Sequence, residues 1–383
     1  MENKKRKKIS VVLPCLNEEK TIGICIEKIK KAFLKYNLDG EIIVADNGST
    51  DRSVEIAKNA GAIVVKEPKK GYGNAYHRGI AEAKGDFIVI ADSDNTYDFD
   101  EINKFIEPLE EGYDLVIGNR FAGMMDKKAM SFLSKIGNPI LSGIMRLFFR
   151  SKIHDSQCGM RSFTRTAYNR LNLQTRGMEY ASEMIVKAIW QNLKIKEVPI
   201  SYAPRVSKSK LSPLRDGWRH LKFMLLYTPN WLFLGPGIFL FLIGLILLIA
   251  MTFGELRIGK IILHLHPMFL GSLLVLLGYQ VFSFGILTKI YAFSKGLMPK
   301  SKLVDFYLKH FSLEKILLLG LIIFLIGFGL ALSIFIVWAR SGFGALFEIR
   351  KSLTAITLMI LGIQIIFTGF FYDIFLIGLR GYK

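Results

Sequence analysis

Four long apolar segments in the second part of the chain place the strongest limit on its fold. Each approaches or exceeds the roughly 20 apolar residues that a helix needs to cross a bilayer. The segments cover residues 231–253, 267–291, 316–339 and 353–379. Charged residues, by contrast, dominate the chain up to about Lys222. The sequence therefore predicts a domain of cytosolic type followed by a membrane domain, in which four transmembrane helices form two hairpins.

The charges around the apolar segments predict their orientation. The loop between the second and third segments is rich in lysine, whereas the other two loops carry fewer cations; its lysines are Lys295, Lys300, Lys302, Lys309 and Lys315. By the positive-inside rule, we expect this loop and both ends of the chain on the cytosolic side. Residues 9–13 form an apolar run too short for a secretory signal. We therefore expect an integral membrane protein of the cell membrane, or of a membrane of the endoplasmic-reticulum type, with a cytosolic catalytic domain.

A basic, amphipathic segment separates the two parts of the chain. Arg215 and Arg219 occur there together with Trp218. This mixture suits a helix that lies in the membrane interface, and a packed surface helix is the alternative. We expect three parts. A cytosolic domain covers residues 1–212, an amphipathic interfacial helix covers 213–230, and a transmembrane domain with two helical hairpins covers 231–383.

The formal net charge of +19 bears on the choice of partners. Lys and Arg residues cluster around the membrane region, where anionic lipid headgroups attract them. We therefore expect a membrane, and no nucleic acid, as the partner of this charge. The three cysteines form no Cys-x-x-Cys pair, so the sequence indicates neither a disulfide framework nor a zinc site.

Strand and helix patterns alternate along the first domain. Short runs of β-branched residues predict strands, and apolar residues at helical spacing predict the helices between them. The predicted strands cover residues 9–13, 41–45, 62–66, 87–91, 113–118 and 195–202. This alternation implies right-handed crossovers and an α/β fold with a doubly wound, mostly parallel sheet. A further amphipathic helix is expected over 131–149, interrupted at residues 137–139.

Two carboxylates follow the predicted strand at 87–91. Asp92 and Asp94 stand at the carboxyl end of this strand, where α/β sheets bind their ligands. An Asp-x-Asp pair there can offer oxygen ligands to Mg²⁺ or Mn²⁺, which then bridges a substrate diphosphate. A solvated turn is the alternative, because Ser93 and Thr96 are ordinary turn residues.

Polar side chains also follow the first two predicted strands. Asn17 and Glu18 come after the first strand, and Asp46 comes after the second. Carboxylates at these positions can accept hydrogen bonds from ribose hydroxyls and from a ring N–H of uracil or guanine. Helix capping explains either position alone. Their place beside Asp92 and Asp94 on neighbouring strands favours one shared site.

Four motifs occur in order along the first domain. They are Val12-Leu13-Pro14 with Asn17-Glu18-Glu19, Asp46-Asn47-Gly48-Ser49-Thr50-Asp51, Asp92-Ser93-Asp94 and Gly118-Asn119-Arg120-Phe121. Together they resemble the family-2 glycosyltransferases, in particular the branch of dolichol-phosphate mannose synthases and polyprenyl-phosphate glucosyltransferases, through about Tyr227. The resemblance implies a nucleotide-sugar-binding fold of the GT-A type with one divalent metal, Mg²⁺ or Mn²⁺. It also implies inverting transfer of a hexose to a membrane polyprenyl (dolichyl) phosphate.

The resemblance further implies roles for single residues. The nucleotide sugar is expected to contact Pro14, Asn17, Glu18, Asp46, Asn47, Asp92, Ser93 and Asp94. The metal is expected on Asp94, with Asp92 beside it.

The acceptor and the leaving group have their own expected residues. The resemblance places Arg120 on the acceptor phosphate, assisted by Ser134 and Lys135. It places Arg205 and Lys210 in a loop that closes on the donor diphosphate. The expected catalytic residues are Asp94, Arg120, Lys135 and Arg205.

The chain departs from the family pattern at two positions. Where the mannose synthases have a metal-binding Gln, this chain has Thr96, which leaves the second metal ligand open. Asn47 also replaces the second Asp of the commoner Asp-Asp pair. The donor, UDP-glucose or GDP-mannose, and the formation of a homo-oligomer are left open. Two alternative functions also remain: transfer to another membrane acceptor, and translocation of a sugar lipid by a flippase with a degenerate nucleotide-binding domain.

Overall fold

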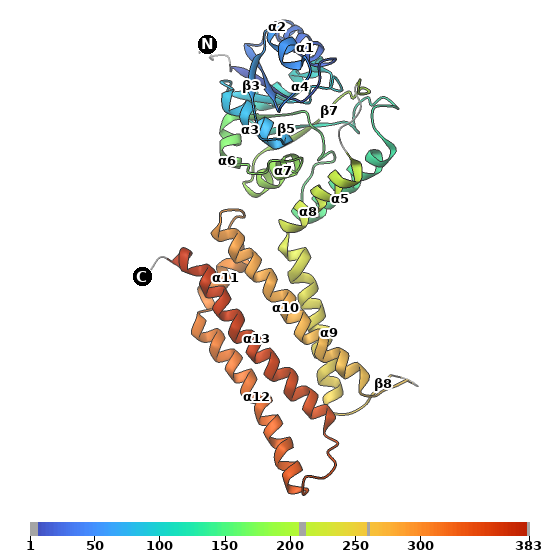
Figure 1. Cartoon of the computed structure of the whole chain (residues 1–383), viewed down its shortest axis with the longest axis vertical. Helices are drawn as coiled ribbons and strands as arrows, with labels where there is room; N and C mark the ends of the chain where they lie inside the picture. The colour runs from blue at the N-terminus through green and yellow to red at the C-terminus, as the bar shows by residue number, and fades with distance from the viewer. Residues whose placement is uncertain (1–6, 207–211, 259–260, 381–383) are drawn as a thin grey trace. The chain divides into compact units, whose positions relative to one another are not determined.

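The computed structural model describes residues 7–206, 212–258 and 261–380. The chain divides into two compact units between Met224 and Leu225 (Figure 1). This point lies inside helix α8 (Pro213–Leu226), between the sequence-based limits of 212 and 230. We call the first part the catalytic unit and the second part the helical unit.

The catalytic unit is built on a seven-stranded sheet with the order β3-β2-β1-β4-β6-β5-β7. Its strands are β1 (Ile9–Cys15), β2 (Gly40–Asp46), β3 (Ile63–Lys66), β4 (Phe87–Ile90), β5 (Leu115–Asn119), β6 (Arg161–Thr164) and β7 (Ile195–Pro199). Only β6 runs antiparallel to its neighbours, β4 and β5. The mostly parallel, doubly wound sheet expected from the sequence is therefore confirmed, and β6 is an addition to it.

The central strands are buried because their residues are apolar on both faces. Val11, Val12 and Leu13 of β1 are fully buried, as are Ile88 and Val89 of β4. Such continuous apolar runs are typical of parallel strands covered by helices. The order β2-β1-β4 then brings the carboxyl ends of three buried strands to one edge of the sheet.

Helices connect these strands. The helix α1 (Ile22–Lys35) buries Ile22, Ile26 and Ile29, which recur at helical spacing. The other helical segments of this unit are α2 (Ser53–Asn59), α3 (Tyr72–Glu82), η1 (Phe99–Glu101), α4 (Asn103–Glu110), α5 (Phe132–Phe149), α6 (Arg165–Leu171) and α7 (Tyr180–Trp190). The interruption expected at 137–139 is wrong, because α5 continues through Pro139 as one helix that begins at the Ser131 cap.

Among its described residues, the helical unit contains four helices long and apolar enough to cross a membrane, as the sequence predicts. They are the segment 230–252, formed by the π-helical turn η2 (Asn230–Leu234) and α9 (Gly235–Thr252), and then α10 (His266–Ser294), α12 (Leu313–Arg340) and α13 (Ile349–Arg380). Two short strands, β8 (Leu256–Ile258) and β9 (Ile261–Leu263), connect α9 to α10. The lysine-rich loop contains a helix that the sequence analysis missed, α11 (Lys302–His310).

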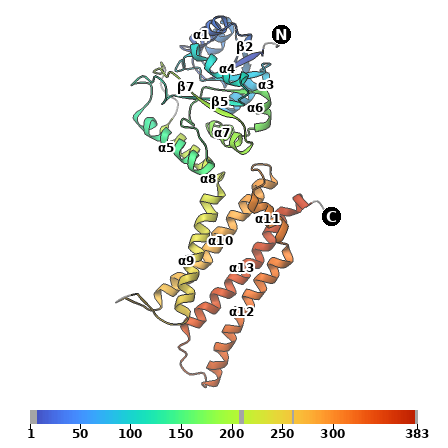
Figure 2. The same cartoon turned by 180° about the vertical axis from the view of Figure 1, so that it is seen from behind.

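The two long helices of each hairpin lie side by side (Figure 2), and their backbones approach closely at small residues. In the first hairpin, α9 and α10 lie side by side, and a Cβ atom added at Gly244 would stand 2.5 Å from the backbone nitrogen of Val275. In the second hairpin, a Cβ atom at Gly327 would stand 2.7 Å from the carbonyl oxygen of Ala355. A second close contact follows in each hairpin, seven residues away on α9 and α12, where Gly237 meets Gly278 and Gly320 meets Gly362. Small residues let helix backbones approach closely, which is a common basis of helix association in membranes.

We predict that Gly244→Leu destabilises the helical unit, because the new side chain must displace the backbone of α10. Overpacking of this kind costs about 1–3 kcal/mol or more. The measurement is thermal unfolding of the full chain in detergent. Gly329→Leu on α12 is the matched control, since nothing lies within 4 Å of a Cβ atom added there. Equal melting temperatures of the two variants would contradict the packing argument.

Candidate active site

Two carboxylates at the end of β4 form the centre of the candidate site. Asp94 is buried, and its Oδ1 accepts hydrogen bonds from the backbone N–H of Thr96 at 3.1 Å and from the Thr96 hydroxyl at 2.6 Å. Asp92 is partly buried and accepts a hydrogen bond from the Tyr72 hydroxyl at 2.9 Å. Thr96 therefore supports Asp94, at the position where the resembling enzymes carry a metal-binding Gln.

The environment of Asp92 opposes its charge. Removal of the carboxylate from water, followed by the nearby charge of Asp94, raises the pKa of Asp92 to about 6. Burial, followed by the Asp92 carboxylate, also raises the pKa of the Tyr72 hydroxyl, which therefore stays protonated and able to donate. Because the charges of Asp92 and Asp94 repel each other, a cation bound between them would stabilise both carboxylates.

A guanidinium group spans the acidic cluster. The Arg205 Nη2 donates to Glu18 Oε1 at 3.0 Å, and its Nε lies 3.2 Å from Asp94 Oδ2 as an ion pair. Burial alone would lower the pKa of Arg205, but Asp94 and Glu18 raise it, so the guanidinium stays charged. The structure thus brings Arg205 to the carboxylates, as the sequence analysis expects of a loop that closes on the site. Its expected partner Lys210 lies outside the described residues.

The loops after β1 and β2 are tied to each other at the same edge of the sheet. The Asn17 Oδ1 accepts from the backbone N–H of Thr50 at 2.7 Å, and Asp46 Oδ1 accepts from that of Ser49 at 3.0 Å. Glu18 is buried, and its backbone N–H donates to Ser53 Oγ at 2.8 Å. These contacts cap and connect the loops, so the three residues expected to bind the nucleotide lie at the same edge of the sheet.

Two further expected residues also lie in this cluster. The Ser93 hydroxyl donates to the carbonyl oxygen of Pro14 at 2.6 Å, which connects the end of β1 to the Asp-x-Asp segment. The strand order therefore gathers Pro14, Asn17, Glu18, Asp46, Ser93 and the acid pair at one place.

The Asn47 side chain both donates and accepts hydrogen bonds, which Asp could not do. Its amide nitrogen donates to the carbonyl oxygens of Glu67 at 3.0 Å and Lys69 at 2.9 Å, and its oxygen accepts from the backbone N–H of Gly71 at 2.7 Å. A carboxylate cannot donate, so Asp at this position would face two carbonyl oxygens. Asn47 thus fixes the loop before α3, whose first residue Tyr72 contacts Asp92.

Arg120 makes a buried ion pair with Asp155. Its Nε and Nη2 donate to the two carboxylate oxygens at 2.7 and 2.8 Å, and its guanidinium lies over the ring of Tyr202. Burial alone would lower the pKa of Arg120, but Asp155 raises it well above its usual value. The Nη1 atom makes no hydrogen bond within the described part of the chain. The acceptor-phosphate role of Arg120 stays a prediction.

Ser134 and Lys135 lie apart from these contacts, in the first turn of α5. The Lys135 Nζ donates to the carbonyl oxygen of Lys127 at 2.7 Å, and Ser134 accepts a hydrogen bond from the Ser131 hydroxyl at 2.9 Å. No hydrogen bond or ion pair between described residues joins either of them to Arg120. Their assistance in acceptor binding stays a prediction as well.

The sequence analysis missed the aromatic support of Asp92. Tyr72 donates to Asp92, and a Cβ atom at Gly159 would stand 2.6 Å from Asp92 Oδ2. The Tyr97 hydroxyl accepts from the backbone N–H of Gly159 at 2.8 Å. In the sequence, Tyr72 lies in a basic, glycine-rich stretch, residues 69–74, and such a stretch before a helix is typical of phosphate binding rather than of support for a carboxylate.

The donor set fits a divalent cation that also binds the substrate. No cluster of three or more His, Cys, Asp or Glu side chains with metal-binding geometry occurs within residues 7–206, 212–258 and 261–380. Asp92 and Asp94 supply hard carboxylate oxygens, and Mg²⁺ is commonly held by one or two carboxylates together with substrate phosphates. Mn²⁺ accepts the same oxygen ligands.

Comparisons with known proteins bear on both parts of the chain. Residues 10–171 match the family model "Glycosyl transferase family 2", and residues 286–376 match "Glycosyltransferase family 2 C-terminal transmembrane region". The low-salt glycan biosynthesis hexosyltransferase Agl6 of Haloferax volcanii is 36% identical over 365 residues, which cover 94% of this chain and 87% of that protein.

Two other proteins match the catalytic part. A dolichyl-phosphate hexose transferase of Haloferax volcanii is 29% identical over 210 residues, covering 55% of this chain and 89% of that protein. The crystal structure of glucosyl-3-phosphoglycerate synthase from Mycobacterium tuberculosis with Mn²⁺, UDP and glucosyl-3-phosphoglycerate covers 57% of this chain and 79% of that chain, at 26% identity and a TM-score of 0.47.

We predict that Asp92→Asn stabilises the folded chain at pH 8 in the presence of EDTA. The pKa of Asp92 lies near 6, above the ordinary value of 3.8, so the folded state holds a proton more tightly than the unfolded state. Above pH 6 the carboxylate is charged in an environment that opposes the charge. A neutral amide should therefore add about 1–3 kcal/mol to the free energy of unfolding.

The same argument gives the pH dependence and a control. The gain should shrink as the pH falls from 6 towards 4, because Asp92 is then already protonated in the folded state. Asp94→Asn should give no such gain, since it weakens the ion pair with Arg205. Chemical unfolding at pH 8 and pH 5 measures both variants, and a destabilised Asp92→Asn protein at pH 8 would contradict the assignment.

We predict that Asp155→Ala lowers the free energy of unfolding by about 3–5 kcal/mol, because it leaves the Arg120 guanidinium buried without its counter-charge. Chemical unfolding of the full chain in detergent measures the change. Glu111→Ala is the control, since it breaks an exposed ion pair with Lys196 and should change stability little. A loss no larger than that of the control would show that the buried pair is dispensable.

Proposed function

Because the chain belongs to glycosyltransferase family 2, we propose that it transfers a hexose from a nucleotide diphosphate sugar to a membrane polyprenyl phosphate, with inversion at the anomeric carbon. The observation that carries the proposal is the cluster of Glu18, Asp92, Asp94 and Arg205, in a chain that also has four apolar helices. The similarity to a dolichyl-phosphate hexose transferase supports a lipid phosphate as the acceptor.

The acidic cluster is assigned to the donor. Asp92 and Asp94 would hold Mg²⁺ or Mn²⁺, which when bound would supply positive charge for the diphosphate leaving group. Glu18 and Asp46, at the ends of neighbouring strands, accept hydrogen bonds from the nucleoside. Tyr72 keeps Asp92 in place through its hydroxyl.

Arg205 is assigned to the leaving group. Its guanidinium bridges Glu18 and Asp94, so an incoming diphosphate competes with these carboxylates for the same cation. Once the diphosphate binds, Arg205 stabilises the negative charge that develops as the bond between the anomeric carbon and the diphosphate breaks. Lys210 is proposed to act with it.

The acceptor needs no general base. A lipid phosphate is already anionic at neutral pH, so one of its oxygens can attack the anomeric carbon while the nucleoside diphosphate leaves from the opposite face. Arg120, Ser134 and Lys135 are proposed to orient this phosphate and to offset its repulsion from the donor. The catalytic unit is proposed to face the cytosol, which follows from the lysine-rich loop between α10 and α12.

The function is tested with purified full-length protein in detergent. The donor is UDP-glucose or GDP-mannose, the acceptor is a polyprenyl phosphate, and Mg²⁺ or Mn²⁺ is present or removed with EDTA. We expect a metal-dependent glycosylated lipid, detected by mass spectrometry, with one of the donors. The free polyprenol without phosphate is the matched acceptor control. Transfer to the alcohol, or to a diacylglycerol, would replace the proposed acceptor by a different membrane acceptor.

We predict that Asp94→Ala lowers the rate of transfer roughly a hundredfold or more, because the metal and the diphosphate lose a charged ligand. The fold should persist, since the side chain lies at the end of β4 rather than in the core. Asp98→Asn is the control: Asp98 is an exposed helix cap near the site, and Asn caps as well. Rates of transfer like those of the native chain in Asp94→Ala would refute the role in metal binding.

A further inference from the structure

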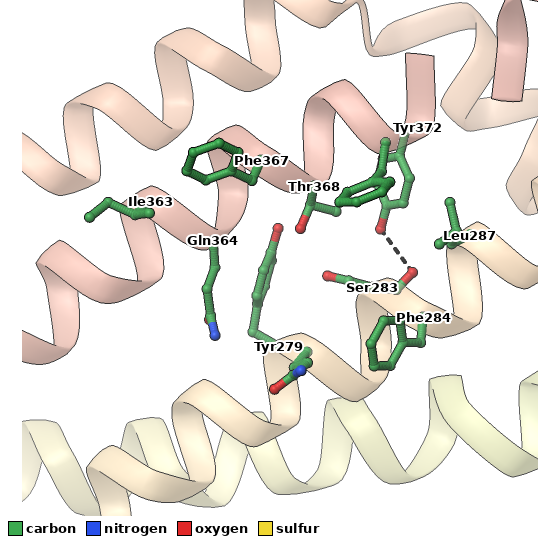
Figure 3. A pocket seen from close by; sticks show the side chains of 11 residues that line it. Tyr279, Ser283, Phe284, Leu287, Ile363, Gln364, Phe367, Thr368 and Tyr372 are labelled. Atoms are coloured by element: carbon green, nitrogen blue, oxygen red, sulfur yellow. Dashed lines mark hydrogen bonds between the residues drawn. The ribbon is translucent and has the colours of Figure 1, made fainter. Parts of the chain in front are cut away.

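A cleft of about 310 Å³ lies between α10 and α13, where the two hairpins of the helical unit meet. Eleven side chains line it, all of them from these two helices (Figure 3). Phe284, Phe367 and Phe371 belong to the lining and are 49%, 61% and 57% exposed, so they form its open rim. Cavities of this size that are mostly apolar, with a few polar groups, are typical ligand sites.

Polar atoms without a hydrogen bond of good geometry lie at the bottom of the cleft. Ser283 is only 6% exposed, and its Oγ makes no hydrogen bond of good geometry within the described residues, although the hydroxyls of Tyr279 and Tyr372 lie near it. The buried Oε1 atom of Gln364 also makes no such hydrogen bond within these residues, and Tyr279 and Thr368 point into the same space (Figure 3). In hydrocarbon, an unpaired hydroxyl or amide costs several kcal/mol. A partner from outside the chain would remove this cost.

Elsewhere the contact between the hairpins pairs its polar groups. The hydroxyls of Thr252 and Thr354 are 2.9 Å apart, and Ser272 and Thr357 share a hydrogen bond of 2.6 Å. Beside the cleft, the Tyr372 hydroxyl donates to the carbonyl oxygen of Ser283 at 3.0 Å. Among the described residues of the helical unit, the buried polar atoms without a hydrogen bond of good geometry thus lie in the cleft.

The charge and depth of the cleft limit its occupant. None of the eleven described residues that line it is charged, so it offers nothing to neutralise a phosphate. Ser283 lies about 26 Å from the start of α10 and about 17 Å from its end, at 1.5 Å per residue. A bilayer core of about 30 Å therefore surrounds it with hydrocarbon. The occupant must be mainly apolar and must carry an uncharged hydrogen-bonding group.

We propose that this cleft binds a membrane lipid through an uncharged hydroxyl or carbonyl group. Ser283 and Gln364 exchange hydrogen bonds with that oxygen, and the hydrocarbon chain packs against the phenylalanine rim. The oxygen belongs either to a long-chain alcohol or to an acylglycerol. The site lies within the helical unit and does not depend on the proposed transfer reaction.

The test uses the full chain in phosphatidylcholine nanodiscs with three photoreactive probes of matched length. One is a long-chain alcohol, one is a diacylglycerol, and one is a hydrocarbon without oxygen. We expect one oxygen-bearing probe to label residues 279–287 and 363–372 roughly tenfold more than the hydrocarbon, which corresponds to one or two hydrogen bonds. The probe that labels identifies the source of the oxygen.

A double variant tests the polar groups. Ser283→Ala with Gln364→Leu should lower the labelling by that probe roughly tenfold and leave the labelling by the hydrocarbon unchanged. Ser333→Ala, at an exposed serine of α12, is the matched control and should change neither. Both variants should first match the native chain in thermal unfolding; if the double variant does not fold, the comparison of the three probes on the native chain decides.

Two results would overturn the proposal. Equal labelling of the cleft by all three probes would mean that its polar atoms select no lipid. Gln280 lines the cleft and is exposed, so a Gln280→Cys chain that forms disulfides between copies, without labelling of the cleft by any probe, would mean that a second copy covers it.

Discussion

The catalytic unit depends on an accumulation of negative charge at the end of buried strands. Asp92 and Asp94 follow β4, and Glu18 follows β1, where the apolar sheet limits access to water. Like charges at this separation repel one another, and burial adds to the cost. The surrounding structure offsets this cost with Arg205, which bridges Glu18 and Asp94, and with the hydroxyls of Tyr72 and Thr96.

This arrangement leaves the site in need of positive charge. The guanidinium group of Arg205 supplies that positive charge through its contacts with Glu18 and Asp94. The Arg120 guanidinium differs from that of Arg205, because Arg120 is neutralised by Asp155 in a buried ion pair. Arg205 thus bridges Glu18 and Asp94, which are assigned to the donor, whereas Arg120 is paired with Asp155.

The sequence predicts the architecture well because the architecture follows from local patterns. Runs of β-branched residues indicate six of the seven strands, and the length of the apolar segments indicates the four long helices. The sequence analysis does not predict β6, because this strand has four residues and Phe163 is its one large apolar side chain. Pro139 predicts a break in α5, but the helix continues through it, although proline has no backbone N–H to donate within the helix.

The candidate site is predictable only in part. Parallel strands carry their loops to one edge, so the gathering of Asn17, Asp46 and Asp94 follows from topology. The support of Asp92 by Tyr72, and the pairing of Arg120 with Asp155, join residues 20 and 35 positions apart. No periodicity marks such contacts, since they depend on how loops fold over the sheet. The sequence shows that Asn47 stands where the family commonly has Asp. The reason becomes clear only in the structure, where Asn47 holds the loop before α3 in place.

The glycine contacts within each hairpin also bear on how the chain enters a membrane. Helices whose backbones fit this closely can associate as soon as both have been inserted, before the remaining helices are synthesised. Each hairpin is then a self-contained unit of assembly, and the polar contacts between hairpins form in a later step. In such an order, the cleft between α10 and α13 is the last part of the helical unit to close, which gives surrounding lipid the opportunity to be enclosed there.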